Sequence, residues 1–135
     1  RLGLIGARGY VGSELIQRLA THPDIELAFV SSRGREGRML SVFEPDAPAD
    51  MRYENLTPGQ ALSRDVDVLV LALPNGLAGE WARAYADAHS RTVLIDLSDD
   101  FRFDPDWYYG LPELNRRAWR GQNRISNPGC YATAM

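Results

Sequence analysis

Short apolar runs alternate along the chain with longer segments in which apolar residues recur at helical spacing. The first run, Leu2–Ile5, leads directly into glycines and predicts a buried strand. Over Tyr10–Ala20 the apolar residues Val11, Leu15 and Leu19 recur at every fourth position, which predicts a helix with one buried face. The chain therefore begins with a strand, a turn and a helix.

The same order is repeated further along the chain. Residues 27–30 form a second apolar run, and residues 66–73 are almost continuous in Val and Leu, as expected of a strand covered on both faces. The alanine-rich segment 77–88 predicts a helix, residues 92–96 predict a short strand, and residues 51–55 are a candidate for another. Successive strand–helix–strand units predict an α/β fold with a doubly wound parallel sheet of the Rossmann type.

Composition narrows the classes of protein to which the chain can belong. Its 135 residues are 44% hydrophobic and 24% charged, as in an ordinary globular domain with one core. A net charge of −3 argues against a nucleic-acid partner, and no apolar run approaches the roughly 18 residues of a membrane span. One cysteine excludes an internal disulfide and fits a reducing compartment, so we expect a cytoplasmic protein. One cysteine and two distant histidines offer no metal-ligand spacing, so we expect no metal.

Three glycines lie between the first strand and the first helix, where a Rossmann fold holds the pyrophosphate of a dinucleotide. Gly6 allows a tight turn, Gly9 lets backbone N–H groups approach phosphate oxygens, and Gly12 lets helix and strand pack closely. The spacing is G-x-x-G-x-x-G rather than G-x-G-x-x-G, so the position between strand and helix carries the prediction. The cofactor-binding residues predicted in this loop are Gly6, Arg8, Gly9, Tyr10, Val11 and Gly12.

The end of the second strand predicts which dinucleotide is bound. An NAD site usually has an acidic residue here for the ribose 2′-hydroxyl, whereas this chain has Ser31, Ser32 and Arg33. Hydroxyl groups and a guanidinium suit a 2′-phosphate, which predicts a preference for NADP(H). The alternative is a solvated basic loop with no ligand.

Cys130 is the only cysteine, and it follows Asn127, Pro128 and Gly129 at a turn that leads into a predicted helix. Backbone N–H groups and the positive end of a helix dipole favour the thiolate, which is the nucleophilic form. We therefore interpret Cys130 as a catalytic nucleophile, with a small buried hydrophobic residue as the alternative.

Four segments occur in an order that resembles the amino-terminal half of the N-acetyl-γ-glutamyl-phosphate reductase family, relatives of the aspartate-semialdehyde dehydrogenases. They are GARGYVGSEL (6–15), DLSDDFR (96–102), YGLPEL (109–114) and SNPGCY (126–131). The resemblance implies an NADPH-dependent oxidoreductase of arginine biosynthesis, which reduces a small-molecule acyl phosphate to an aldehyde. It also implies that Cys130 attacks the acyl carbon, expels phosphate and holds a thioester.

Further site residues follow from the resemblance and from the strand ends. The family places Arg102 near the substrate, where its guanidinium suits the acyl phosphate; an ion pair with a neighbouring aspartate is the alternative. Asn127 orients the cysteine loop, the residues 127–129 that precede Cys130, or it donates to a developing oxyanion, or it is simply a turn residue. Pro74, Asn75 and Gly76 follow a central strand at its carboxyl end, where open α/β sheets bind ligands, and are further cofactor candidates.

The chain departs from the family pattern at three positions. Arg8 stands where the family usually has a small hydroxyl residue, and it offers an additional phosphate contact. Asn75 is often histidine in the family, and Ala132 replaces a common proline. None of these positions is the nucleophile.

The family's catalytic histidine belongs to a second domain, and no motif places His22 or His89 near Cys130. The sequence begins at Arg1 and stops at Met135 inside a helical pattern, which fits a part of a longer protein. We therefore expect residues 1–135 to be the dinucleotide-binding domain of a two-domain homo-oligomeric enzyme, able to bind cofactor without turnover. The alternatives are a reductase of aspartyl or aminoadipyl phosphate, and a non-catalytic NADP-binding module with an inert Cys130.

Overall fold

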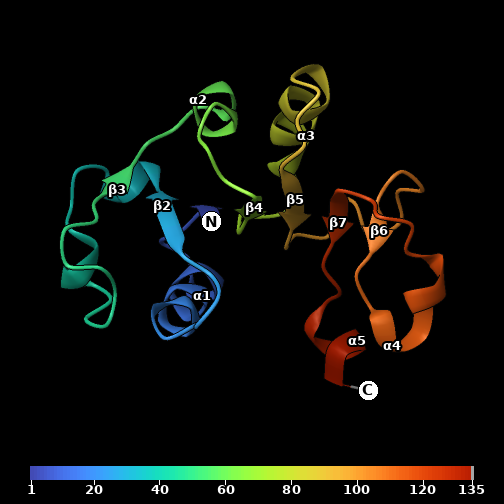
Figure 1. Cartoon of the computed structure of the whole chain (residues 1–135), viewed down its shortest axis with the longest axis horizontal. Coiled ribbons are helices and arrows are strands. Elements are labelled where there is room, and N and C mark those ends of the chain that lie inside the picture. The colour runs from blue at the N-terminus through green and yellow to red at the C-terminus, as the bar shows by residue number, and fades with distance from the viewer. Residues whose placement is uncertain (135) are drawn as a thin grey trace.

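The computed structural model describes residues 1–134, which form a seven-stranded parallel sheet with helices on both faces (Figure 1). The strand order is β3-β2-β1-β4-β5-β7-β6. The strands are β1 (Leu2–Ile5), β2 (Leu27–Ser31), β3 (Tyr53–Glu54), β4 (Val68–Leu71), β5 (Val93–Asp96), β6 (Tyr108–Tyr109) and β7 (Arg124–Ser126). The predicted doubly wound sheet is confirmed.

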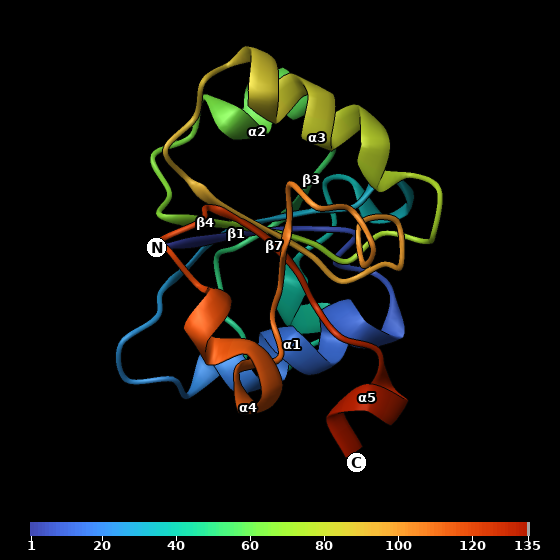
Figure 2. The same cartoon turned by 90° about the vertical axis from the view of Figure 1, so that its right-hand side faces the viewer.

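Helices cover both faces of the sheet. Figure 2 shows α2 and α3 on one side of the strands, and α1, α4 and α5 on the other. The helices are α1 (Tyr10–Ala20), α2 (Pro58–Leu62), α3 (Ala78–Asp87), α4 (Pro112–Asn115) and α5 (Cys130–Ala134), with 3-10 turns at Arg33–Arg35, Leu40–Val42 and Arg116–Ala118. Burial of both faces explains why the central strands are continuously apolar.

The apolar core lies on both sides of the sheet, because successive strand side chains point to opposite faces. Leu4 of β1 packs with Ile16 and Leu19 of α1, while its neighbour Ile5 packs with Trp81 of α3 on the other face. Gly3 leaves room on that second face for the ring of Phe29: a Cβ at position 3 would lie 2.3 Å from the ring. The core thus holds β1 between α1 on one face of the sheet and α3 on the other.

The last residues of all seven strands form one row across the sheet. In the order of the strands these residues are Glu54, Ser31, Ile5, Leu71, Asp96, Ser126 and Tyr109. Because the strands are parallel, the loops that follow them all leave from the same edge. The glycine loop after β1 and the cysteine loop after β7 are separated by three strand spacings, about 14 Å.

Candidate functional site

A cavity of about 820 Å³ opens at this edge, beside the ends of β1 and β4. The strand order reverses there, since β2 pairs with one side of β1 and β4 with the other. Open α/β sheets bind ligands at such a reversal, and the volume is that of a cofactor site. The predicted cofactor residues among the lining residues are Gly6, Arg8, Gly9, Tyr10, Val11, Ser31, Ser32, Arg33 and Pro74.

The glycine loop has the geometry that its glycines suggest. Gly6 has a φ of +80°, and a Cβ there would lie 2.2 Å from the carbonyl oxygen of Ala72. The N–H groups of Gly6 and Ala7 both donate to the carbonyl oxygen of Ser31, at 3.0 and 3.1 Å. A Cβ on Gly12 would lie 2.8 Å from Ala7 Cα, so Gly12 brings α1 close to the loop and is buried rather than in the cavity wall.

The beginning of α1 faces the cavity. Its N-cap, Gly9, offers no side-chain hydrogen bond, and the first turn contains no acidic residue. The first backbone N–H groups of a helix have no partner within the helix, and with the dipole they attract anions. Tyr10 and Val11 are exposed in this first turn and line the cavity.

Positive charge at the cavity comes from Arg8 and Arg33, and no Asp or Glu of residues 1–134 lines it. The two arginines come from different loops that meet at Gly34, where a Cβ would lie 2.6 Å from Arg8 Nη1. Neither arginine takes part in an ion pair among residues 1–134. Arg35 is held elsewhere: its guanidinium lies 3.8 Å from the ring centroid of Phe43 and donates to Tyr53 Oη at 2.9 Å.

The two serines of the strand end are buried and line the cavity. Ser31 Oγ accepts the N–H of Leu56 at 3.1 Å, so this hydroxyl also holds the loop after β3. Sequence reasoning did not identify Leu56, nor the cavity residues Asn55, Leu77 and Trp81. Sheet topology brings them to the site, and no local motif marks them.

The predicted residues after β4 are divided between two environments. Pro74 lines the cavity, whereas Asn75 and Gly76 bond to the segment after β5. Asn75 Oδ1 accepts the N–H of Asp99 at 3.2 Å, and the N–H of Gly76 donates to Asp100 Oδ1 at 2.6 Å. We name residues 97–102, which follow β5, the β5 loop.

Asp96, at the end of β5, is fully buried. Its Oδ2 accepts the hydroxyl of Ser98 at 2.7 Å, and its Oδ1 accepts the Ser98 N–H at 3.2 Å. Burial raises the pKa of Asp96 above its ordinary value, and the hydrogen bonds from Ser98 oppose this only in part. Asp96 pairs in the sheet with Ser126, whose Oγ is buried without a hydrogen-bond partner among residues 1–134.

Cys130 is the first residue of α5 and its thiol is exposed in this chain. The cysteine loop directly precedes it. The N–H of Asn127 donates to the Asp96 carbonyl at 2.8 Å, and Asn127 Nδ2 donates to the Pro128 carbonyl at 2.9 Å. Arg102 Nε donates to the Asn127 carbonyl at 3.3 Å, and Arg102 is in no ion pair within the described residues. Arg102 therefore supports the loop that carries the thiol.

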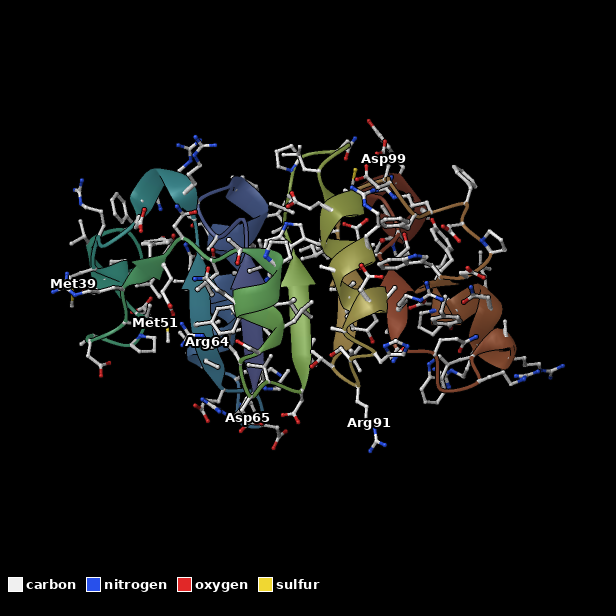
Figure 3. All side chains as sticks on the ribbon, turned by 90° about the horizontal axis from the view of Figure 1, so that it is seen from above. Met39, Met51, Arg64, Asp65, Arg91 and Asp99 are labelled. Atoms are coloured by element: carbon white, nitrogen blue, oxygen red, sulfur yellow. The ribbon has the colours of Figure 1, made fainter. Side chains whose placement is uncertain are left out.

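No histidine lies beside this thiol. His22 and His89 follow the carboxyl ends of α1 and α3, which run back from the strand ends to the opposite edge of the sheet. Figure 3 shows the two edges of the sheet, with Arg91 at one and Asp99 at the other. Within residues 1–134, no group of three or more His, Cys, Asp or Glu side chains is arranged to hold a metal ion. No helix in the same part of the chain is both long and apolar enough to cross a membrane.

Residues 1–122 match a family described as semialdehyde dehydrogenase, NAD binding domain. The chain belongs to this family. The description of the family assigns NAD binding to a domain of this kind. The matched region ends before Cys130, so it does not itself include the thiol.

The similar curated proteins are named N-acetyl-gamma-glutamyl-phosphate reductase. The protein from Stenotrophomonas maltophilia is 54% identical over 134 residues, which are 99% of this chain and 42% of that protein. The protein from Xylella fastidiosa strain 9a5c is also 54% identical, over 99% of this chain and 40% of its own length. The resemblance seen in the sequence motifs is confirmed, and the chain spans about two fifths of the length of these relatives.

Solved structures of semialdehyde dehydrogenases share this fold. Aspartate semialdehyde dehydrogenase II from Vibrio cholerae, complexed with ASA, superposes with a TM-score of 0.69 at 28% identity, over 96% of this chain and 42% of that one. The enzyme from Candida albicans with NADP has a TM-score of 0.71 at 19% identity, over 98% of this chain and 43% of that one, and shows the common fold alone.

Proposed function

We propose that the chain binds NADPH and forms the cofactor domain of an N-acetyl-γ-glutamyl-phosphate reductase. The observation that carries the cofactor assignment is the charge of the cavity: Arg8 and Arg33 line it, and no carboxylate does. A ribose 2′-hydroxyl is usually held by a carboxylate, whereas a 2′-phosphate is held by guanidinium groups. The names of the relatives at 54% identity support the substrate.

The residues around the cavity fit the parts of a dinucleotide. A side chain at Gly6 or Gly12 would collide with the backbone of Ala72 or Ala7, so the loop can only be this tight with glycine. The first turn of α1 offers N–H groups to the pyrophosphate, and Ser32 and Arg33 lie on the β2 side for the 2′-phosphate. The residues after β4, on the side of the cavity nearer to β7 and Cys130, would hold the nicotinamide half.

The proposed reaction begins at Cys130. Its thiolate sulfur bonds to the acyl carbon of the substrate, and the bond from that carbon to the phosphate oxygen breaks, which releases phosphate. Arg102 supports the cysteine loop, and its outer nitrogens are candidates for holding the departing phosphate. The thioester carbon would then accept a hydride, which is the chemistry that NADPH would supply when bound. The carbon–sulfur bond then breaks, which gives the semialdehyde and regenerates the cysteine.

A second domain completes the proposed enzyme. The relatives are more than twice as long as this chain, and both histidines lie at the edge opposite Cys130. We assign the proton-transferring base, the choice of acyl side chain and the contacts of a homo-oligomer to that second domain. Residues 1–135 are then the dinucleotide-binding domain, in a protein that we place in the cytoplasm, where an exposed unpaired thiol stays reduced.

Titration of the chain with NADPH and, separately, with NADH tests the cofactor assignment. We expect clear binding of NADPH and weaker binding of NADH, measured by calorimetry on protein whose fold is checked by circular dichroism. Tighter binding of NADH would overturn the preference for NADPH while leaving the family intact.

The chemistry is tested in the whole reductase with Cys130→Ser, which we expect to abolish both phosphate release and NADPH oxidation. Retained activity would exclude the thioester. Assays with N-acetylglutamyl, aspartyl and aminoadipyl phosphates distinguish the proposed substrate from the alternatives. A wild-type enzyme that reduces none of them, with a Cys130 that resists alkylation, would instead indicate a non-catalytic NADP-binding module.

A further inference from the structure

The β5 loop is bonded to two other loops at the same edge of the sheet. On one side it contacts the segment between β4 and α3, through Asn75 and Gly76. On the other side Arg102 holds the cysteine loop through the Asn127 carbonyl, and its guanidinium lies 3.0 Å from where a Cβ on Gly129 would be. One short segment thus connects the cofactor cavity wall with the loop that carries Cys130.

Asp100 makes the contact with the β4–α3 segment. Its Oδ1 accepts the N–H of Gly76 at 2.6 Å and its Oδ2 accepts the N–H of Ala78 at 3.0 Å. The N-cap residue of α3, Leu77, provides no capping side chain, so Asp100 performs that role from a distant part of the sequence. Figure 3 shows the neighbouring Asp99 at the end of α3 opposite Arg91, which is the end where this helix begins.

The backbone of Asp100 is in turn held by a hydrogen bond to Ser98. Its N–H donates to Ser98 Oγ at 3.2 Å, and the same hydroxyl donates to the buried carboxylate of Asp96 at 2.7 Å. The Asp96 carbonyl accepts the N–H of Asn127 at 2.8 Å. A continuous series of hydrogen bonds therefore runs from the beginning of α3, through Asp100, Ser98 and Asp96, to Asn127 in the cysteine loop.

The geometry points to Asp100 as a positioning residue, which fixes the cavity wall formed by Pro74 and Leu77 relative to the cysteine loop. The inference rests on the proposed binding of NADPH. The glycine loop lies at β1 and the 2′-phosphate residues at β2, so the wall after β4 borders the nicotinamide half of the cofactor. Asp100 then acts on the nicotinamide half and not on the adenosine half.

The sign of the expected effect separates positioning from simple electrostatics. NADPH is an anion, so removal of a nearby carboxylate would by charge alone strengthen its binding. If Asp100 positions the cavity wall, its removal frees the N–H groups of Gly76 and Ala78 and weakens binding instead. The two effects have opposite directions.

The test compares Asp100→Asn with the wild-type chain, using NADPH and adenosine 2′,5′-bisphosphate as the two ligands. In Asp100→Asn one carboxylate oxygen becomes an NH₂ group that faces an N–H donor, so one bond is lost. We expect the Kd of NADPH to rise about tenfold, while the Kd of adenosine 2′,5′-bisphosphate changes by less than about twofold. Calorimetry measures both constants, below the thermal transition of each variant.

Two variants serve as controls. Asp99→Asn removes the exposed neighbouring charge and keeps both the Asp99 backbone N–H bond to Asn75 and the two bonds of the Asp100 carboxylate, so it should leave NADPH binding equal or slightly tighter. Tyr85→Phe removes the 2.6 Å hydrogen bond from Tyr85 to the Thr92 carbonyl at the other end of α3, so it lowers Tm without moving the cavity wall. Its Kd values should match those of the wild type.

Each outcome decides the inference. A tenfold loss for NADPH alone supports it, whereas unchanged or tighter NADPH binding in Asp100→Asn overturns it and leaves the proposed cofactor in place. Equal losses for both ligands would assign Asp100 a purely structural role and also overturn the inference. Failure of the folded wild-type chain to bind NADPH would overturn the proposed cofactor and the inference with it.

Discussion

Arg33 is exposed at the cavity and has no ion-pair partner among residues 1–134. Arg35, two residues later, stacks on Phe43 and bonds to Tyr53, which withdraws it from ligand binding. The contacts of each side chain, rather than the number of basic residues in the loop, therefore decide which arginine can meet a 2′-phosphate.

Replacement of Arg33 by alanine should weaken NADPH binding about 10- to 100-fold, because hydrogen bonds to charged groups contribute about 1.5–3 kcal/mol. The affinity for NADH, which has no 2′-phosphate, should not change. Calorimetric titration with both dinucleotides measures the difference. Arg38→Ala, in the same exposed loop but outside the cavity, is the control and should leave both affinities unchanged.

Gly6→Ala should lower the free energy of unfolding by about 2 kcal/mol or more, because strained backbone conformations and steric overlap both contribute. The φ of +80° disfavours alanine, and the new Cβ would lie 2.2 Å from the Ala72 carbonyl oxygen. Gly37→Ala is a matched control, since Gly37 also has a positive φ, +76°, but nothing within 4 Å of the added atom. Urea unfolding compares the two; equal losses would show that the close approach to β4 costs nothing.

At the scale of elements, the sequence predicts the helices and strands that are determined by their own residues rather than by pairing with distant segments. The bounds of β1 and α1 agree with the prediction, because a short apolar run and a regular helical face need no knowledge of their neighbours. The strand predicted over 66–73 is shorter, Val68–Leu71, because its partners β1 and β5 end at Ile5 and Asp96.

Strands β6 and β7 were missed, since each has two or three residues and exists only through pairing. Helix α2 was also missed, although its capping box, Thr57 with Gln60, is a readable signal.

The site could be predicted only in part, for the same reason. The motifs identified the glycine loop and the segment around Cys130 because their residues are adjacent in the sequence. The position of Trp81 in the cavity and the bond from Asp100 to Gly76 depend on how β4 and β5 pair, which no local pattern contains.

The segment after β5 should give the protein a characteristic dependence of stability on pH. Burial raises the pKa of Asp96 in the folded protein, with Asp100 adding to the rise and Arg102 opposing it. The folded state therefore binds the proton more tightly than the unfolded state. The stabilisation that protonated Asp96 gives the folded state is fully present below the ordinary aspartate pKa of 3.8. It is lost as the pH rises through the higher pKa that Asp96 has in the folded protein. Asparagine at this position is neutral throughout.

The unfolding free energy of Asp96→Asn, relative to wild type, should accordingly increase with pH above 3.8 and then level off. Urea unfolding of both proteins across a pH series measures this difference and cancels the contributions of other groups. A difference that stays constant, or that falls as the pH rises, would contradict a raised pKa.

At the scale of the whole molecule, the domain holds the thiol and the cofactor cavity at one edge and both histidines at the other. The helices α1 and α3 run from the first edge of the sheet to the second. The histidines that follow their carboxyl ends therefore lie at the edge away from the thiol. For the proposed mechanism, this arrangement predicts that the base for Cys130 comes from residues outside this domain.

The chain alone should bind NADPH yet fail to oxidise it in the presence of N-acetylglutamyl phosphate. NADPH absorbance and phosphate release, followed in parallel, measure turnover, and the whole reductase provides the positive control. Steady turnover by the chain alone would mean that a base within residues 1–135 has been overlooked.

The single row in which all seven strands end also bears on how such enzymes diversify. The loops of the proposed cofactor site and the cysteine loop all leave from that edge, while the two apolar clusters of the core lie between the helices and the sheet. The Vibrio cholerae enzyme keeps the same fold at 28% identity, so many exchanges of sequence are compatible with this framework. Evolution can thus rewrite specificity loop by loop, and a protein engineer can graft loops between relatives at the same seven points of attachment.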